Sequence, residues 1–103
     1  MNSLTNTYDS IEKLIYDEKL RIEAIDFHPE LDVMLIILNS KAILHQSLSS
    51  YKRLQNASKE ALNDYELIEA GTGIHWNSLD EDLSLKGFLK DELMNVIKPK
   101  NVA

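Results

Sequence analysis

The feature that most constrains the fold is an unbroken apolar run at residues 33–38, which reads VMLIIL. Such runs are typical of strands that are covered on both faces, because neither side needs polar residues. We therefore expect a central β-strand here, with Leu35 and Ile37 both in the interior.

The segments on either side of this run have the patterns of two further strands. Residues 20–27 alternate imperfectly between apolar and polar side chains, and residues 28–30, which contain Pro29, predict a turn. The expected apolar face of this first strand consists of Leu20, Ile22 and Ala24. Residues 41–48 alternate after a short turn at residues 39–40. Together the three strands predict an antiparallel meander.

Three regions have the apolar period of amphipathic helices. The first region, capped by Asn6 or Thr7, places four apolar side chains on one face, namely Tyr8, Ile11, Leu14 and Ile15. Residues 49–65 predict two short helices, the second capped by Ser58. The last region, which Pro99 should end, has an apolar stripe made of Leu85, Phe88, Leu89, Leu93, Val96 and Ile97. The first helix either packs on the domain or serves as a partner-binding or dimer helix.

Length and composition favour a single domain. A chain of 103 residues that is 44% hydrophobic can bury one modest core. The fold class that we expect is α+β: a small three-stranded antiparallel meander with short helices, plus an N-terminal and a C-terminal amphipathic helix. The expected parts are a helical extension at residues 1–19, the α+β domain at residues 20–98 and a frayed tail at residues 99–103.

Charge and cysteine content exclude several classes of function. The net charge of −6 would repel a phosphate backbone, so direct nucleic-acid binding by this chain alone is disfavoured, whereas a basic protein partner fits. The chain has no cysteine, which excludes disulfides, thiolate zinc sites and a cysteine nucleophile. No secretory signal pattern or membrane-spanning apolar run occurs, so we expect a soluble cytoplasmic protein without membrane contact. Self-association is compatible with the sequence.

Residues 71–88, which read GTGIHWNSLDEDLSLKGF, have the most uneven composition. Gly71 and Gly73 permit a tight loop that would deliver Trp76 to the core. Gly87, inside the helix that follows, indicates a close contact with another element. The acidic triplet is expected just ahead of that helix, where negative charge is favourable, and consists of Asp80, Glu81 and Asp82.

The residues alone leave two interpretations of this stretch open. His75 with Asp80 and Asp82 supplies nitrogen and oxygen ligands that could suit a divalent metal, and a metal could activate water. The structural interpretation makes Trp76 a core anchor, His75 a half-buried side chain bonded to backbone, and the carboxylates a cap for the helix. The spacing matches no closed metal site, and neither a phosphate loop nor a nucleophile elbow occurs, so we expect no resident metal and no cofactor.

Several uncommon sequence words occur in a fixed order. They are YKRLQNAS at 51–58, YELI at 65–68, GTGIHW at 71–76 and LDEDLS at 79–84, followed by Gly87. In this combination the chain resembles the bacterial domain of unknown function family 2442 (DUF2442), over roughly residues 21–89. It departs from the family at Asn77, where proline is common, and at Ser40, where glycine is common.

The resemblance implies a small α+β domain with a strand meander and short helices. It also implies a small protein that is often encoded beside a second small protein, in a suspected toxin–antitoxin arrangement. We therefore expect an acidic protein–protein interaction module, antitoxin-like in its most specific form, that neutralises or regulates a partner protein encoded nearby. The partner-binding candidates are His75, Trp76, Asp80, Glu81 and Asp82, with Glu81 expected to be the most exposed. The alternative is a small metal- or ligand-binding protein or hydrolase that uses His75 with Asp80 and Asp82.

Overall fold

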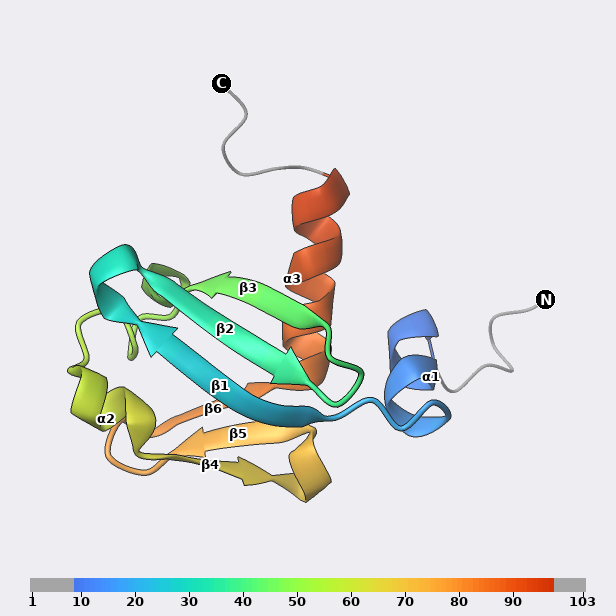
Figure 1. Cartoon of the computed structure of the whole chain (residues 1–103), viewed down its shortest axis with the longest axis horizontal. Helices are drawn as coiled ribbons and strands as arrows, with labels where there is room; N and C mark the ends of the chain where they lie inside the picture. Colours follow the sequence, from blue (N-terminus) through green and yellow to red (C-terminus); the bar gives the residue numbers. More distant parts are fainter. Residues whose placement is uncertain (1–8, 98–103) are drawn as a thin grey trace.

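The computed structural model describes residues 9–97, and the fold is α+β with two three-stranded antiparallel sheets (Figure 1). The first sheet contains β1 (Ile22–His28), β2 (Val33–Leu38) and β3 (Ile43–Ser47), and the second contains β4 (Tyr65–Ile68), β5 (Gly73–Trp76) and β6 (Glu81–Ser84). The helices are α1 (Ser10–Tyr16), α2 (Lys59–Asn63) and α3 (Leu85–Ile97). Between residues 9 and 97, none of these helices has the length and apolarity needed to cross a membrane.

The first sheet confirms the expected meander, with β2 in its centre. β2 is not covered on both faces, however, because its side chains alternate in burial. The buried set consists of Met34, Ile36 and Leu38, and the half-buried set on the outer face consists of Val33, Leu35 and Ile37. The expectation that Leu35 and Ile37 lie in the interior is therefore wrong. In the described part of the chain, residues 9–97, no helix covers the outer face of this sheet, so an all-apolar run here does not mean two covered faces (Figure 1).

A β-bulge explains the imperfect alternation of β1. Ile22 pairs with Leu38 but Ala24 pairs with Ile37, so Glu23 is an extra residue in β1. The bulge reverses the alternation, and the inward-facing residues are Ile22, Ile25 and Phe27. The predicted apolar face of Leu20, Ile22 and Ala24 is wrong for this reason.

The second sheet was not predicted and is the main correction to the expected fold. Residues 71–88 do not form one tight loop; they supply strands β5 and β6 and the start of α3. Each of these strands is only four residues long, too short for a clear period-2 pattern.

The two meanders share one local design. In each, a three-residue 3₁₀ helix joins the first two strands, at Pro29–Leu31 and at Glu69–Gly71. The backbones of the two connections differ, because only Asp32, with φ 57°, is left-handed in the first, whereas Glu69, Ala70 and Gly71 all have positive φ in the second. The two units are therefore alike in strand order and in the length of the turn but not in its conformation.

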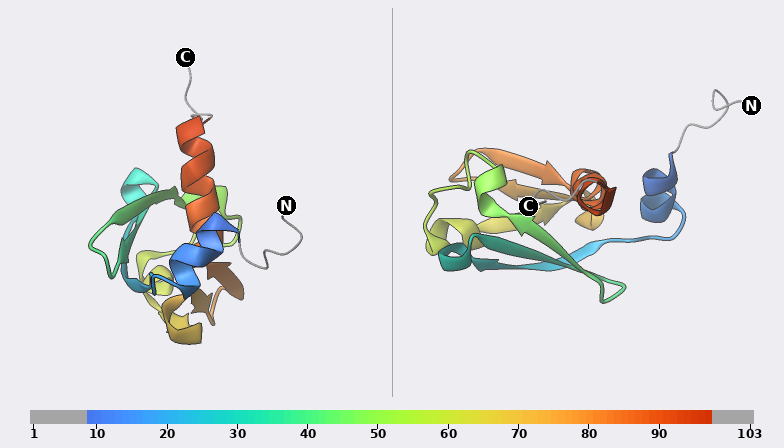
Figure 2. Two further views of the ribbon diagram at one scale, coloured as in Figure 1. Left: turned by 90° about the vertical axis from the view of Figure 1, so that its right-hand side faces the viewer. Right: turned by 90° about the horizontal axis from the view of Figure 1, so that it is seen from above.

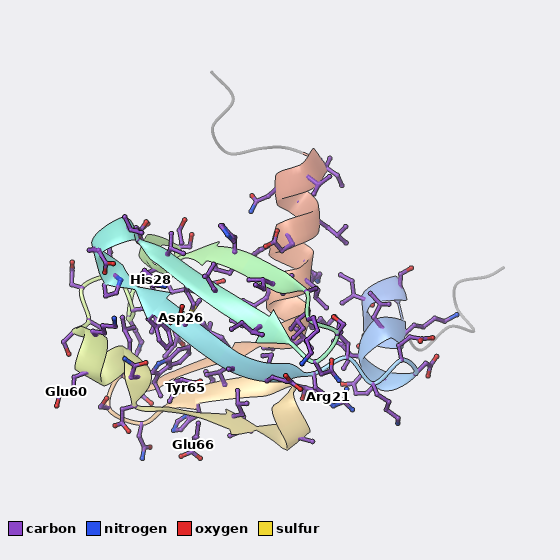
Figure 3. All side chains as sticks on the ribbon, viewed as in Figure 1. Arg21, Asp26, His28, Glu60, Tyr65 and Glu66 are labelled. Carbon is purple, nitrogen blue, oxygen red and sulfur yellow. The ribbon has the colours of Figure 1, made fainter. Side chains whose placement is uncertain are left out.

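The core lies between the two sheets and is centred on three aromatic rings. Phe27 packs edge-on against Tyr65 and Trp76, with ring centroids 5.7 and 6.2 Å apart. The Ile25 N–H donates to the Tyr65 hydroxyl over 3.1 Å, so Tyr65 also ties the two sheets together (Figure 3). This bond satisfies one backbone N–H of the edge strand β1 that would otherwise need water or another strand.

Helix α1 packs on the domain, as the sequence predicted, and buries Ile11 and Ile15. Its cap is Asp9, which forms a capping box with Glu12; the predicted caps Asn6 and Thr7 lie outside the described residues. Leu14, expected on the buried face, is 45% exposed. Arg21 holds the end of α1, because its guanidinium donates to the carbonyls of Ile15 and Leu20. Figure 3 shows Arg21 between α1 and the first sheet.

The remaining helices are only partly as predicted. Ser58 caps α2 by accepting from the Ala61 N–H, but residues 49–57 form a 3₁₀ turn and further turns in place of a first α-helix. Helix α3 buries Leu85 and Phe88. Its last turns extend beyond the sheets (Figure 2), where Leu93, Met94, Val96 and Ile97 are all at least half exposed. The expected tail from Pro99 onward lies outside the described residues.

Candidate functional site

The β5–β6 hairpin contains all five partner-binding candidates, and Trp76 anchors it. The Trp76 side chain is fully buried, and its indole N–H donates to the Leu62 carbonyl over 2.9 Å. The hairpin is therefore fastened to the end of α2. Because no part of Trp76 reaches the surface, its role is to hold the hairpin in place and not to touch a partner.

His75 faces the opposite side of β5 and lies in a row of three polar side chains across the second sheet. The strand register sets Glu66 on one side of His75 and Asp82 on the other. His75 Nδ1 lies 2.6 Å from Asp82 Oδ1, and Nε2 lies 3.0 Å from Asn77 Oδ1. The hydrogen bond with Asp82, and then that with Asn77, raises the pKa of His75 above its ordinary value. His75 is thus bonded to side chains, whereas the sequence predicted backbone partners.

The acidic triplet lies in a turn and in β6, directly ahead of α3, so its predicted place before a helix is confirmed but its predicted role as the helix cap is wrong. Asp80 has left-handed backbone with φ 53°, and its carboxylate pairs with the Arg53 guanidinium at 3.2 Å. β6 follows immediately, and Ser84 at its end accepts from the Gly87 N–H over 3.0 Å, which caps α3. Ser84, and not the carboxylates, therefore supplies the helix cap.

The exposure of the triplet follows from the turn, which contains Asp80, and from the alternation of β6, which contains Glu81 and Asp82. The side chain of Asp80 is 89% exposed and that of Asp82 is 71% exposed, whereas Glu81 pairs with Trp76 and is half-buried. The expectation that Glu81 is the most exposed carboxylate is therefore wrong. Asp80 and Asp82 are the two members of the triplet that face solvent.

The three glycines serve close packing around the hairpin. Gly71 has φ 92°, and a Cβ there would lie 3.1 Å from the Ile22 carbonyl oxygen, so this position favours glycine for two reasons. A Cβ at Gly73 would come within 3.0 Å of the Ile68 side chain. A Cβ at Gly87 would lie 3.2 Å from Ser84 Oγ, so the close contact predicted for Gly87 is with the capping residue of its own helix.

The proposed metal ligands do not converge. Asp82 is bonded to His75, but Asp80 is turned to Arg53. Among residues 9–97, no group of three histidine or carboxylate side chains is placed to hold a metal ion. A second pair of the same kind occurs on the first sheet, where His28 Nε2 lies 2.8 Å from Asp26 Oδ2 (Figure 3). Both pairs are surface hydrogen bonds between neighbouring side chains.

One end of the molecule gathers exposed carboxylates, and we call it the acidic end. It consists of Glu60, Asp64, Asp80 and Asp82. The β5–β6 turn adjoins α2 there, across a shallow depression that Glu60, Asp64 and Ser78 help to line. Figure 3 shows Glu60 at this end. The sequence identified the triplet but missed the contribution of α2 and of Arg53, because only the fold brings these residues together.

The apolar side chains exposed on α1 and α3 form a second surface, which we call the apolar helix surface. It consists of Leu14, Leu93, Met94, Val96 and Ile97. The two helices lie side by side at the end of the molecule that is remote from α2 (Figures 1 and 2). Lys86 joins them through ion pairs with Asp9 and Glu12, of which the Glu12 pair is 3.0 Å long. The sequence missed this surface because the apolar stripe of α3 predicts burial along its whole length.

Comparisons with known proteins agree with the fold. The chain is similar to a protein of unknown function from Rhodospirillum rubrum, with 25% identity and a TM-score of 0.61 over 70% of this chain and 87% of that one. It is also similar in fold to an uncharacterised protein from Chromobacterium violaceum, with 23% identity and a TM-score of 0.65 over 99% of this chain and 96% of that one. No curated protein sequence matches the chain. The family described as "Protein of unknown function (DUF2442)" matches residues 22–92.

Proposed function

Because the chain belongs to the DUF2442 family, whose function is unknown, we propose a function from its own geometry: it is a small acidic interaction module that regulates a partner protein. Neutralisation of a toxin-like partner encoded nearby is the most specific form of this proposal. The module acts in the cytoplasm on a partner whose contact surface is basic.

The observation that carries the proposal is the pair of exposed carboxylates on an anchored hairpin. Arg53 fixes Asp80, His75 fixes Asp82, and Trp76 holds the backbone beneath them. Fixed charges lose little conformational freedom on binding, so the cost of association is low. A basic partner would meet carboxylates that are already oriented, and charges at the rim of an interface act mainly on the association rate.

The test uses the product of the adjacent gene, co-expressed and purified with this chain. Neutralising Asp80 and Asp82 together, as Asp80→Asn with Asp82→Asn, should slow association roughly 3- to 10-fold at low salt, with a smaller effect at high salt. Asparagine is well suited here because it tolerates the left-handed backbone of position 80. Charge reversal at Glu81 is a poorer test, because this side chain is half-buried.

A matched control removes the same amount of charge at the other end of the molecule. Asp17→Asn with Glu18→Gln, both on the exposed surface after α1, should leave the association rate close to that of the unmodified chain. Circular dichroism confirms the fold of both variants. Equal rates for the two variants at both salt concentrations would remove the acidic end from the interface, and a neighbouring product that does not bind at all would refute the regulatory role.

A further inference from the structure

The apolar helix surface contains a groove beside a ridge. The function proposed for the acidic end gives no role to either of them. The groove has a volume of about 210 Å³ and runs between α1 and α3, lined by Ile11, Leu14, Leu89, Glu92, Leu93 and Val96. Glu92 is the one charged residue among these, and its Oε1 already accepts from the His45 N–H over 2.7 Å. The lining of the groove is therefore apolar apart from Glu92, whose carboxylate already has a hydrogen-bond partner.

The ridge is the final part of α3. Exposed fractions are 51% for Leu93, 52% for Met94, 76% for Val96 and 67% for Ile97. A short helical segment gains most of its stability from packing, and among residues 9–97 this segment extends away from the other elements (Figure 2). The ridge and Leu14 lie outside residues 22–92, so they are additions to the part of the chain that the family shares.

We propose that this surface joins two copies of the chain into a symmetric dimer, in which the ridge of each copy lies in the groove of the other. A two-fold interface requires that one surface be complementary to itself, and a ridge adjacent to a groove meets this requirement. The helices α3 of the two copies would run antiparallel across the axis.

The composition of the surface agrees with this occupant. Its five residues are between 45% and 76% exposed, and a stable interface buries about 800 Å² per partner, of which about 65% is apolar in homodimers. The apolar core of such an interface is therefore already present. Flanking polar residues of α1 and α3 would supply the rim.

Charge also favours a second copy over a basic partner at this surface. Within α3 the charges cancel, because Lys86 and Lys90 balance Asp91 and Glu92. Two α3 helices can therefore meet without net repulsion between them, and the carboxylates of Asp9 and Glu12 beside them already pair with Lys86, although the whole chain carries a net charge of −6. The carboxylates of the acidic end lie away from the apolar helix surface, where ionic screening weakens their effect.

Sedimentation equilibrium of the purified chain tests the proposal without any other protein. The chain should show twice the monomer mass at micromolar concentration. Val96→Glu with Ile97→Glu places two charges on the most exposed apolar residues of the ridge and should raise the dissociation constant by about 100-fold or more. These side chains are mainly exposed, so the circular dichroism spectrum should change little, whereas the thermal midpoint should fall by as much as the dimer contributes to stability.

The matched control places the same two charges on exposed apolar residues elsewhere, one in the turn between β1 and β2 and one in β3. Leu31→Glu with Ile43→Glu, at positions that are 67% and 54% exposed, should leave the dimer intact. A chain that stays monomeric up to millimolar concentration would overturn the proposal, since another occupant would then cover the surface. A dimer that survives in the Val96→Glu, Ile97→Glu variant, or one that is lost in both variants, would overturn it as well. These results do not depend on the partner proposed above.

Discussion

His75 and Trp76 are adjacent in the chain but face opposite sides of β5, and this alternation separates their roles. Trp76 enters the core and holds the hairpin through the Leu62 carbonyl, whereas His75 joins a polar row on the outer face. The burial of Trp76 could be predicted from its size and its glycine-rich surroundings. The partners of His75 could not, because Asp82 becomes its neighbour only through the pairing of β5 with β6.

Two adjacent isoleucines in β2 should differ sharply in their contribution to stability. Ile36 is fully buried between the sheets, so Ile36→Ala should lower the free energy of unfolding by about 2–5 kcal/mol through lost burial and the cavity left behind. Ile37 lies half-buried on the outer face, so Ile37→Ala should cost clearly less. Denaturant unfolding of both variants measures the difference. Equal losses would mean that the outer face of the first sheet is covered in solution.

The pairing of His75 with Asp82 predicts a pH dependence. Because Asp82 raises the pKa of His75 above 6.5, protonation of His75 favours the folded state; this contribution is complete below about pH 6.5 and is lost as the pH rises through the folded-state pKa. Asp82→Asn should lower the His75 midpoint in an NMR titration of the ring protons. Asp26→Asn, which alters the corresponding pair on the first sheet, should leave that midpoint unchanged. A midpoint unaffected by Asp82→Asn would contradict the hydrogen bond.

At the scale of elements, the meander of β1, β2 and β3 could be predicted because β2 is long and apolar and a turn stands on each side of it. The second meander could not, because four-residue strands show no clear period and Gly73 suggests a loop. The register of β1 was missed for another reason, since a bulge at Glu23 reverses the alternation and no local residue type announces it.

Arg21 is one of the side chains that hold α1 in position, beside the buried Ile11 and Ile15 and the ion pairs of Lys86. Arg21 donates to the carbonyl of Ile15, near the end of α1, and to that of Leu20, just before the first sheet. Arg21→Ala should therefore speed the exchange of the amides of α1 by about 10-fold or more. Arg53→Ala, which removes the guanidinium at the acidic end, is the control and should leave α1 protected. Hydrogen exchange followed by mass spectrometry measures both, and unchanged protection in Arg21→Ala would show that Ile11 and Ile15 hold the helix without it.

On the scale of the whole molecule, the sheets separate two surfaces of different chemistry. The acidic end lies beside α2, and the apolar helix surface is formed by α1 and α3 (Figure 1). Composition predicts an acidic protein but not this division, because the carboxylates of α2 and of β6 lie far apart in sequence. In the account proposed here, the apolar helix surface pairs two chains and each acidic end binds one partner, so neither surface depends on the other.

The most direct test of this account is the mass of the complex with the adjacent gene product, measured by multi-angle light scattering for three forms of the chain. The unmodified chain should give an assembly of two chains and two partners. Val96→Glu with Ile97→Glu should give one chain with one partner, and Asp80→Asn with Asp82→Asn should still give a dimer of this chain but bind the partner more slowly. If the change in α3 abolished partner binding, or the change at the acidic end dissociated the dimer, the two surfaces would not be independent and the account would be wrong.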